Sequence, residues 1–255
     1  MNNRIDLNAD LGESVNGRIV GDDAGVMPWI SSANIACGFH AGDPTIMRGT
    51  LIACRKHGVA AGAHPSFDDI AGFGRREMPI APDVVYVQTL YQIGALAGIA
   101  RSVGIGLTHV KPHGALYNQA ARDRRLADAI AQAVRDFDSS LILLGLAGSA
   151  LIEAGRALGL RVRREAFCDR RYRADGALVP RAQVGAVLES IDEAVAQAVS
   201  IACEGTVRAD DGSAVRIEAD TLCIHGDRAD AAALARRVHE ALHNAGIQVS
   251  QEEEN

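Results

Sequence analysis

The sequence predicts a parallel α/β fold and, within that class, a (β/α) barrel of seven strands. Short apolar runs alternate along the chain with longer segments of helical periodicity, which is the pattern of repeated strand–helix units. Polar and ionisable residues gather at the carboxyl ends of the predicted strands. In a closed barrel those ends form one rim, whereas an open sheet would spread them along a crevice, so a barrel is favoured.

The predicted elements follow one another in strand–helix order. The strands are expected near Arg4–Asn8, Ser32–Cys37, Val59–Ala63, Gly106–Lys111, Leu141–Gly145, Val162–Cys168 and Thr221–His225. The helices are expected near Asp22–Ile30, Pro44–His57, Pro82–Val103, Arg122–Phe137, Ser149–Leu158, Val187–Cys203 and Arg228–His243. Pro44 and Pro82 fall in a first helical turn, where proline is tolerated, and Gly58, Gly104 and Gly159 follow helix ends, where left-handed caps are common.

Two dipeptides predict excursions from the barrel. Asp175-Gly176 and Asp211-Gly212 each lie between short extended runs, which is typical of hairpins. The chain has no linker, low-complexity segment or clear repeat, so residues 1–255 are expected to form a single domain. The acidic run Glu252–Glu254 is expected to be a solvated tail.

Composition excludes several classes of protein. The formal charge of −6 and the sequence pI near 5.7 give no basic footprint for nucleic acid. Neither an apolar leader nor an apolar run of membrane length is present, so a cytoplasmic protein without a membrane segment is expected. The five cysteines are widely spaced and form no C-x-x-C pair, which favours reduced thiols over a disulfide framework.

Strand periodicity places many polar groups in one predicted mouth. Residues two apart on a strand share a face, so Asp6, Asn8 and Asp10 are expected on one side of the first strand. Six of the seven predicted strands carry such groups at or just beyond their carboxyl ends. These groups are Asn8, Asp10, Asn34, His40, His64, Lys111, His113, Glu165, Asp169 and His225. One such residue alone usually caps a helix or satisfies backbone groups, but their coincidence indicates a shared active site.

Two further patterns bear on metal and phosphate binding. His109 and His113 are four residues apart, but Pro112 and the apolar run before it argue against the helix that a zinc-protease motif requires. No Walker motif is present. The turn Gly145–Ser149 follows a strand and opens a helix, so it predicts either an anion cradle or an ordinary tight turn.

Two arginine pairs follow glycine or aspartate near predicted strand ends. Arg75 and Arg170 could each hold a carboxylate or phosphate, because guanidinium groups bind such anions with two hydrogen bonds. Arg76 and Arg171, their neighbours, are expected to be surface charges. Lys111 is expected to meet Glu165 inside the mouth, either as a structural pair or as a cation for which a substrate anion competes.

The chain resembles the LamB/YcsF family in motifs that span nearly its whole length. These motifs are Asp6–Glu13 (DLNADLGE), Ser32–Pro44 (SANIACGFHAGDP), Gly62–Ser66 (GAHPS), Gly72–Arg76 (GFGRR), Val110–Asn118 (VKPHGALYN) and Cys223–Asp227 (CIHGD). One departure is Cys168, in Glu165–Arg170, where the family usually has alanine; the polar residues of that motif are in place.

The resemblance implies a barrel akin to the glycoside hydrolase/deacetylase superfamily. It implies ATP-dependent cleavage of 5-oxo-L-proline to L-glutamate by a 5-oxoprolinase in which this chain works with partner subunits B and C. ATP would then be bound by those partner subunits or shared with them. A divalent metal is a further expectation.

Roles are expected for the clustered residues. Asp10, His64 or Glu165 would be the general base for water, and Lys111 and Arg170 would hold anionic oxygens. His40, His113 and His225 would donate protons or bind a metal. Substrate-binding groups are expected at Asn8, Asn34, Arg75, Asp169 and Arg170.

Two alternatives stay open at this point. Aspartate and histidines at barrel strand ends also suit a metal-dependent, deacetylase-like hydrolase of sugars or amides. The chain could instead be a non-catalytic subunit that presents substrate to its partners, which the missing nucleotide motif favours.

Overall fold

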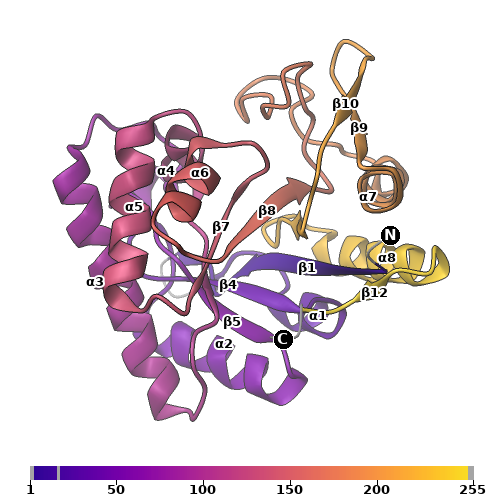
Figure 1. Ribbon diagram of the computed structural model, residues 1–255. Coiled ribbons are helices and arrows are strands. Elements are labelled where there is room, and N and C mark those ends of the chain that lie inside the picture. Colours follow the sequence, from indigo (N-terminus) through magenta and orange to yellow (C-terminus); the bar gives the residue numbers. More distant parts are fainter. Residues whose placement is uncertain (1–2, 16–17, 252–255) are drawn as a thin grey trace.

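The computed structural model describes residues 3–15 and 18–251. Within these ranges, seven parallel strands close into a barrel, which confirms the predicted fold class (Figure 1). In hydrogen-bonding order they are β1 (Arg4–Leu11), β4 (Ser32–Ala36), β5 (Ala60–His64), β6 (His109–Val110), β7 (Ile142–Leu146), β8 (Val162–Phe167) and β11 (Thr221–Ile224). Pairing of β11 with β1 closes the ring. All carboxyl ends of these strands therefore meet at one mouth.

Helices cover the outside of the barrel (Figure 1). They are α2 (Pro44–His57), α3 (Pro82–Ser102), α5 (Arg124–Phe137), α6 (Ala150–Ala157), α7 (Ile191–Glu204) and α8 (Ala231–Asn244), each within a few residues of its prediction. None of the helices in the described ranges is long and apolar enough to cross a membrane.

The helices differ from the prediction in two places. The helix expected over 22–30 is divided into α1 (Asp23–Val26) and a 3-10 turn, η1 (Met27–Trp29). Pro28 lies in the second segment and has no N–H to continue the α-helical hydrogen bonds. A short helix, α4 (Gly114–Ala120), was not predicted and precedes α5.

Excursions leave the barrel at its rim. The hairpin predicted from Asp211-Gly212 is present as β9 (Thr206–Arg208) and β10 (Ala214–Arg216), and it projects from the barrel in Figure 1. Asp175-Gly176 forms a turn between Tyr172 and Leu178. These two residues form one isolated antiparallel β-bridge, so the predicted hairpin has no extended strands. Further strands that were not predicted are β2 (Ser14–Val15), β3 (Arg18–Ile19) and β12 (Gln248–Val249). The predicted acidic tail, Glu252–Glu254, lies outside the described residues.

The two faces of the barrel strands have different environments. Leu7 and Ala9 belong to the apolar core between β1 and the helices, and both are fully buried. The alternate residues hydrogen-bond across the interior of the barrel, where Asn8 Nδ2 donates to Glu165 Oε1 at 3.0 Å and to Thr221 Oγ1 at 2.7 Å. The strand alternation predicted from sequence thus produces a polar interior that leads up to the mouth.

Gly62 offers a test of how tightly this interior is packed. A methyl group added at Gly62 would overlap the ring of His109 inside the barrel. We expect Gly62→Ala to lower the free energy of unfolding by about 1–3 kcal/mol, because the core has no room for it. The matched control is Gly98→Ala in α3, where an added methyl group meets nothing within 4 Å. That variant should gain up to about 1 kcal/mol from helix propensity. Denaturant titration measures both, and equal stabilities would contradict the packing argument.

Candidate active site

Lys111, which follows β6, is the centre of the buried polar network. Its Nζ lies 2.8 Å from Glu165 Oε1 and donates to Asp10 Oδ1 at 2.9 Å, Asn8 Oδ1 at 3.2 Å and Cys223 Sγ at 3.0 Å. Burial disfavours the ammonium form, but the acidic neighbours outweigh it and hold the pKa of Lys111 well above its usual value. The expected contact with Glu165 is therefore present, and Asp10 adds a second carboxylate.

His64 and His113 have tautomers that their backbone contacts define. His64 Nδ1 lies 2.7 Å from the carbonyl oxygen of Lys111, and His113 Nε2 lies 2.9 Å from that of Phe73. A carbonyl only accepts, so each of these nitrogens carries the proton in a neutral ring. The other two nitrogens, His64 Nε2 and His113 Nδ1, then bear lone pairs and lie 3.0 Å apart. Two facing lone pairs need a cation between or beside them.

Glu13 and His40 complete this cluster. Glu13 Oε1 is 3.3 Å from His113 Nδ1 and 3.1 Å from His40 Nε2, and the rings of His40 and His113 are stacked at 3.8 Å. His40 Nδ1 is buried and has no hydrogen-bond partner among the described residues. Burial lowers the pKa of His40 and of His113, which favours neutral imidazoles. Glu13, His40, His64 and His113 offer ligand atoms within 4.8 Å of one another and could hold a metal ion.

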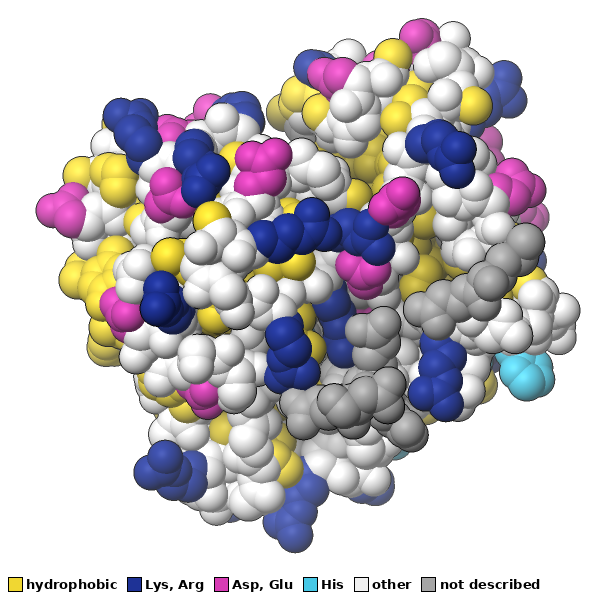
Figure 2. Space-filling model, in the orientation of Figure 1, with side chains coloured by type: hydrophobic (Ala, Val, Ile, Leu, Met, Phe, Trp, Pro, Cys, Tyr) yellow, Lys and Arg dark blue, Asp and Glu magenta, His cyan; other side chains and the backbone are white. Residues whose placement is uncertain are grey.

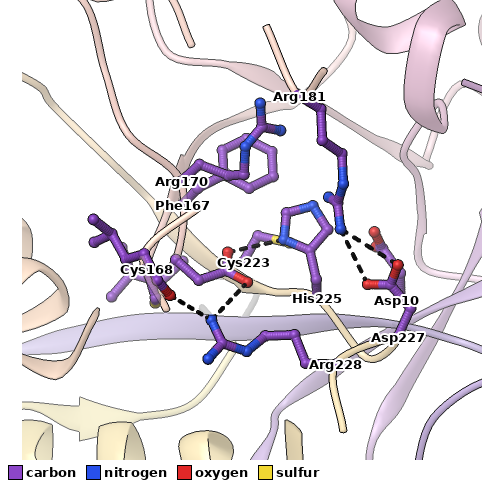
Figure 3. A network of polar contacts seen from close by, with 12 residues as sticks. Asp10, Phe167, Cys168, Arg170, Arg181, Cys223, His225, Asp227 and Arg228 are labelled. Atoms are coloured by element: carbon purple, nitrogen blue, oxygen red, sulfur yellow. Dashed lines mark hydrogen bonds and ion pairs between the residues drawn. The ribbon is translucent and has the colours of Figure 1, made fainter. Parts of the chain in front are cut away.

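His225 stands on the β11 side of the mouth with a carboxylate behind it. Its Nδ1 lies 2.8 Å from Asp169 Oδ1, and its ring stacks on Phe167 with centroids 5.4 Å apart. Figure 3 shows His225 within a polar network between Arg170 and Phe167 on one side and Asp10 on the other. Burial would raise the pKa of Asp169, but the charge of His225 and of nearby arginines holds it below its usual value. Asp169 is fully buried and bonds to His225, so it is placed to orient that ring, and its predicted contact with substrate stays a prediction.

A cavity of about 700 Å³ opens over these groups. The predicted residues that line it are Asp10, His64, Arg75, Lys111, His113, Arg170 and His225. The turn Leu146–Ser149, part of the predicted anion cradle, also lines it. Other predicted residues lie beneath the cavity: His40 and Glu165 are fully buried. Asn8 and Asn34 are also fully buried and bond to carboxylates, and their predicted contacts with substrate stay predictions.

Several residues of the site were not predicted. Glu13 belongs to a motif quoted from the sequence but lies beyond β1, where strand alternation gives no direction. Cys223 faces Lys111 inside the barrel. Cys223 lies on β11 two residues before His225, so strand alternation puts both on one face and could have indicated this contact. Arg181 comes from the excursion after β8 and carried no sequence signal. The surface role expected for Arg76 agrees with its ion pair to Asp69.

Comparison with known proteins identifies the chain. Residues 5–255 match the LamB/YcsF family. The chain belongs to the LamB/YcsF family. Curated relatives in this family include the A subunit of the 5-oxoprolinase of Bordetella pertussis, 56% identical over 98% of this chain and 99% of the relative. The A subunit of the 5-oxoprolinase of Tolumonas auensis is 54% identical over 96% of this chain and 98% of the relative.

Solved structures agree with the family and the fold. A crystal structure of the lactam utilization protein from Thermus thermophilus superposes with a TM-score of 0.92 at 48% identity, covering 98% of this chain and all of that one. A putative cellobiose-phosphate cleavage protein from Enterococcus faecalis gives a TM-score of 0.57 at 12% identity, covering 98% of each chain. The second likeness shows a shared fold alone.

The ion pairs of Lys111 can be tested by removing its charge. Lys111→Met keeps the aliphatic stem and deprives Asp10 and Glu165 of their shared cation. We expect the free energy of unfolding to fall by about 3–5 kcal/mol, because buried carboxylates lose their counter-charge. Denaturant unfolding measures the change. The double variant Lys111→Met/Glu165→Gln removes one of the stranded charges and should regain part of the loss. A Lys111→Met chain as stable as the parent would contradict this account of the network.

Proposed function

We propose that this LamB/YcsF chain is the A subunit of a 5-oxoprolinase and carries the site that opens the lactam. The enzyme would cleave 5-oxo-L-proline to L-glutamate with hydrolysis of ATP, together with subunits B and C. The observation that supports the proposal most strongly is one cavity lined by the ionised carboxylate of Asp10, by His64 and His113 of the histidine cluster, and by His225. The names of relatives that are more than half identical agree with it.

Ring opening adds one water molecule across the amide. The water oxygen bonds to the carbonyl carbon, its proton passes to a base, the C–N bond breaks, and the ring nitrogen takes up a proton. Asp10 is the base in our proposal: burial opposes ionisation, but the ammonium group of Lys111 helps to hold the pKa of Asp10 well below its usual value, so the carboxylate is present. Hydrogen bonds from Asn34 Nδ2 at 2.8 Å and from Lys111 Nζ at 2.9 Å to Asp10 Oδ1 fix its direction.

His225 supplies the proton to the leaving nitrogen in this proposal. Its Nδ1 is bound to Asp169, so Nε2 is the nitrogen available to a ligand in the cavity. His225 follows Ile224, whose Cα pairs with that of Ala9, so the acid stands beside Asp10 at the ends of two neighbouring strands. A general acid suits an amide, whose nitrogen leaves only when it is protonated. An unstrained five-membered lactam does not open spontaneously, which is why ATP hydrolysis must be coupled to the step. The chain has no Walker motif, so we assign nucleotide binding to the partner subunits or to a surface shared with them.

A metal ion fits the cluster described above. Glu13, His40, His64 and His113 would hold it, since nitrogen and carboxylate ligands suit zinc and similar ions and the facing lone pairs call for a cation. When bound, such an ion polarises a carbonyl group or acidifies a water molecule. The same observation favours the second candidate function, a metal-dependent hydrolase of another amide or of an acetylated sugar.

Reconstitution separates these functions. With ATP, 5-oxo-L-proline and subunits B and C, the chain should be required for glutamate formation. We expect His225→Gln to remain folded and to reduce turnover roughly 10²–10⁴-fold, the usual contribution of a general acid. His239→Gln is the control, because that histidine lies on α8 and bonds to the carbonyl oxygen of Trp29. Undiminished glutamate formation without the chain, or with His225→Gln, would overturn the proposal.

Metal content tests the cluster independently of turnover. We expect the purified chain to bind a stoichiometric divalent ion, measured by atomic emission after dialysis against a metal buffer. His64→Ala and Glu13→Gln should each reduce the bound metal, because each removes a ligand atom. His239→Gln should retain the parent stoichiometry. An unchanged metal content in both cluster variants would place the ion elsewhere.

A further inference from the structure

We propose that Arg170 and Arg181 form a subsite for a small oxyanion, a carboxylate or a phosphoryl group, on the wall of the active-site cavity. The inference rests on the proposed function in one respect: the anionic group would belong to the lactam substrate or to its phosphorylated form. Both arginines line the cavity that also contains Asp10, His64 and His225.

Arg170 is a buried cation without an acidic contact. Its Nε donates to the carbonyl oxygen of Ala186 at 3.3 Å and its Nη2 to that of Val179 at 2.7 Å. Among the described residues, no carboxylate forms an ion pair with it. Burial and the charge of Arg181 lower the pKa of Arg170 to about 10, yet it stays charged near neutral pH. Asp169 favours the charged form through space, but the hydrogen bonds of Arg170 go to carbonyl oxygens, so an anion that arrives beside it would stabilise the charge further.

Within residues 3–15 and 18–251, the ion-pair partner of Arg181 is a carboxylate that it shares with Arg75. Arg75 Nη2 lies 2.5 Å from Asp227 Oδ2. Arg181 Nη2 lies 3.3 Å from the same oxygen and 3.4 Å from Oδ1, as Figure 3 shows. One carboxylate thus serves two guanidinium groups, and the longer contacts belong to Arg181. Arg170 adds a third guanidinium group to the lining of the cavity.

The other charged groups of the cavity compensate one another. Lys111 pairs with Asp10, and Arg122 pairs with Glu77 at the outer rim. Asp175 lies at the tip of an exposed turn, where its carboxylate accepts from the backbone of Ala177. Figure 2 shows Lys and Arg side chains gathered in a band across the middle of this face. The excess of positive charge therefore lies at Arg75, Arg170 and Arg181, in a chain whose formal net charge is −6.

Guanidinium forks match the oxygen spacing of carboxylates and phosphates. In 5-oxo-L-proline the carboxylate is borne by the carbon next to the ring nitrogen. An anion held by Arg170 and Arg181 would thus keep the amide within the cavity that His225 and Asp10 line. A phosphoryl group on the lactam oxygen would meet the same chemistry. The subsite therefore selects lactams that carry an anionic group over neutral ones.

Calorimetric titration of the full chain tests the subsite with three probes: 5-oxo-L-proline, 2-pyrrolidinone, which lacks the carboxylate, and inorganic phosphate. We expect at least one of the two anions to bind roughly tenfold or more tightly than 2-pyrrolidinone, as the loss of a charge-assisted contact implies. If 5-oxo-L-proline is the anion that binds more tightly than 2-pyrrolidinone, the occupant of the subsite is a carboxylate. If inorganic phosphate is that anion, the occupant is a phosphoryl group.

Variants decide whether the two arginines are responsible. Arg181→Gln should weaken binding of the anion roughly tenfold and leave 2-pyrrolidinone unaffected. Arg170→Lys keeps the charge but loses the fork, and should weaken the same probe. Arg122→Gln is the matched control, since Arg122 lines the cavity but is already paired with Glu77. Unchanged anion binding in both Arg181→Gln and Arg170→Lys would overturn the subsite. Arginine-dependent anion binding by a chain that fails to support glutamate formation would keep the subsite and overturn the proposed function.

Discussion

A charged lysine enclosed in a parallel barrel has to be compensated by groups from several strands. Lys111 meets Asp10 from β1, Glu165 from β8 and Cys223 from β11, so one ammonium group joins distant parts of the ring. Each of these side chains would be costly to bury alone, and together they form a network whose members hold one another in place. Asn34 adds a hydrogen bond to Asp10 from the neighbouring strand. The carboxylate of Asp10 is thereby fixed and ionised before any ligand enters, which is the preorganisation that hydrolysis of an amide requires.

The cavity above this network is divided into regions of different chemistry. Neutral imidazoles and Glu13 form the region suited to a metal, His225 with its buried partner Asp169 forms the acid–base region, and arginines form the region suited to an anion. A small ring with a carbonyl group, a nitrogen and a carboxylate has one group for each region. This correspondence is why the geometry and the names of the relatives favour the same substrate class, although each argument is independent of the other.

Strand periodicity explains which parts of the site could be predicted from the sequence. Asp10, Lys111 and His225 lie on or just beyond strands, where a period of two residues determines the face, and the mouth follows from parallel topology. The sequence could not reveal that Asp169 is turned towards His225, because partners on different strands depend on register. Arg181 lies in an irregular excursion whose path is set by contacts made only in the folded chain. The helix predicted over 22–30 follows the helical periodicity of that segment, whereas Pro28 lacks the N–H that would continue the α-helical hydrogen bonds.

Histidine-selective NMR tests the central claim most directly, because the chain has eight histidines and they divide between the mouth and the periphery. The full chain would be titrated with 5-oxo-L-proline while the ring nitrogens are observed. The account predicts shifts for His64, His113 and His225, which line the cavity. It predicts no change for His57, His239 and His243, which lie on α2 and α8. Shifts confined to these outer histidines, or none at saturating ligand, would contradict a lactam site in the mouth of the barrel.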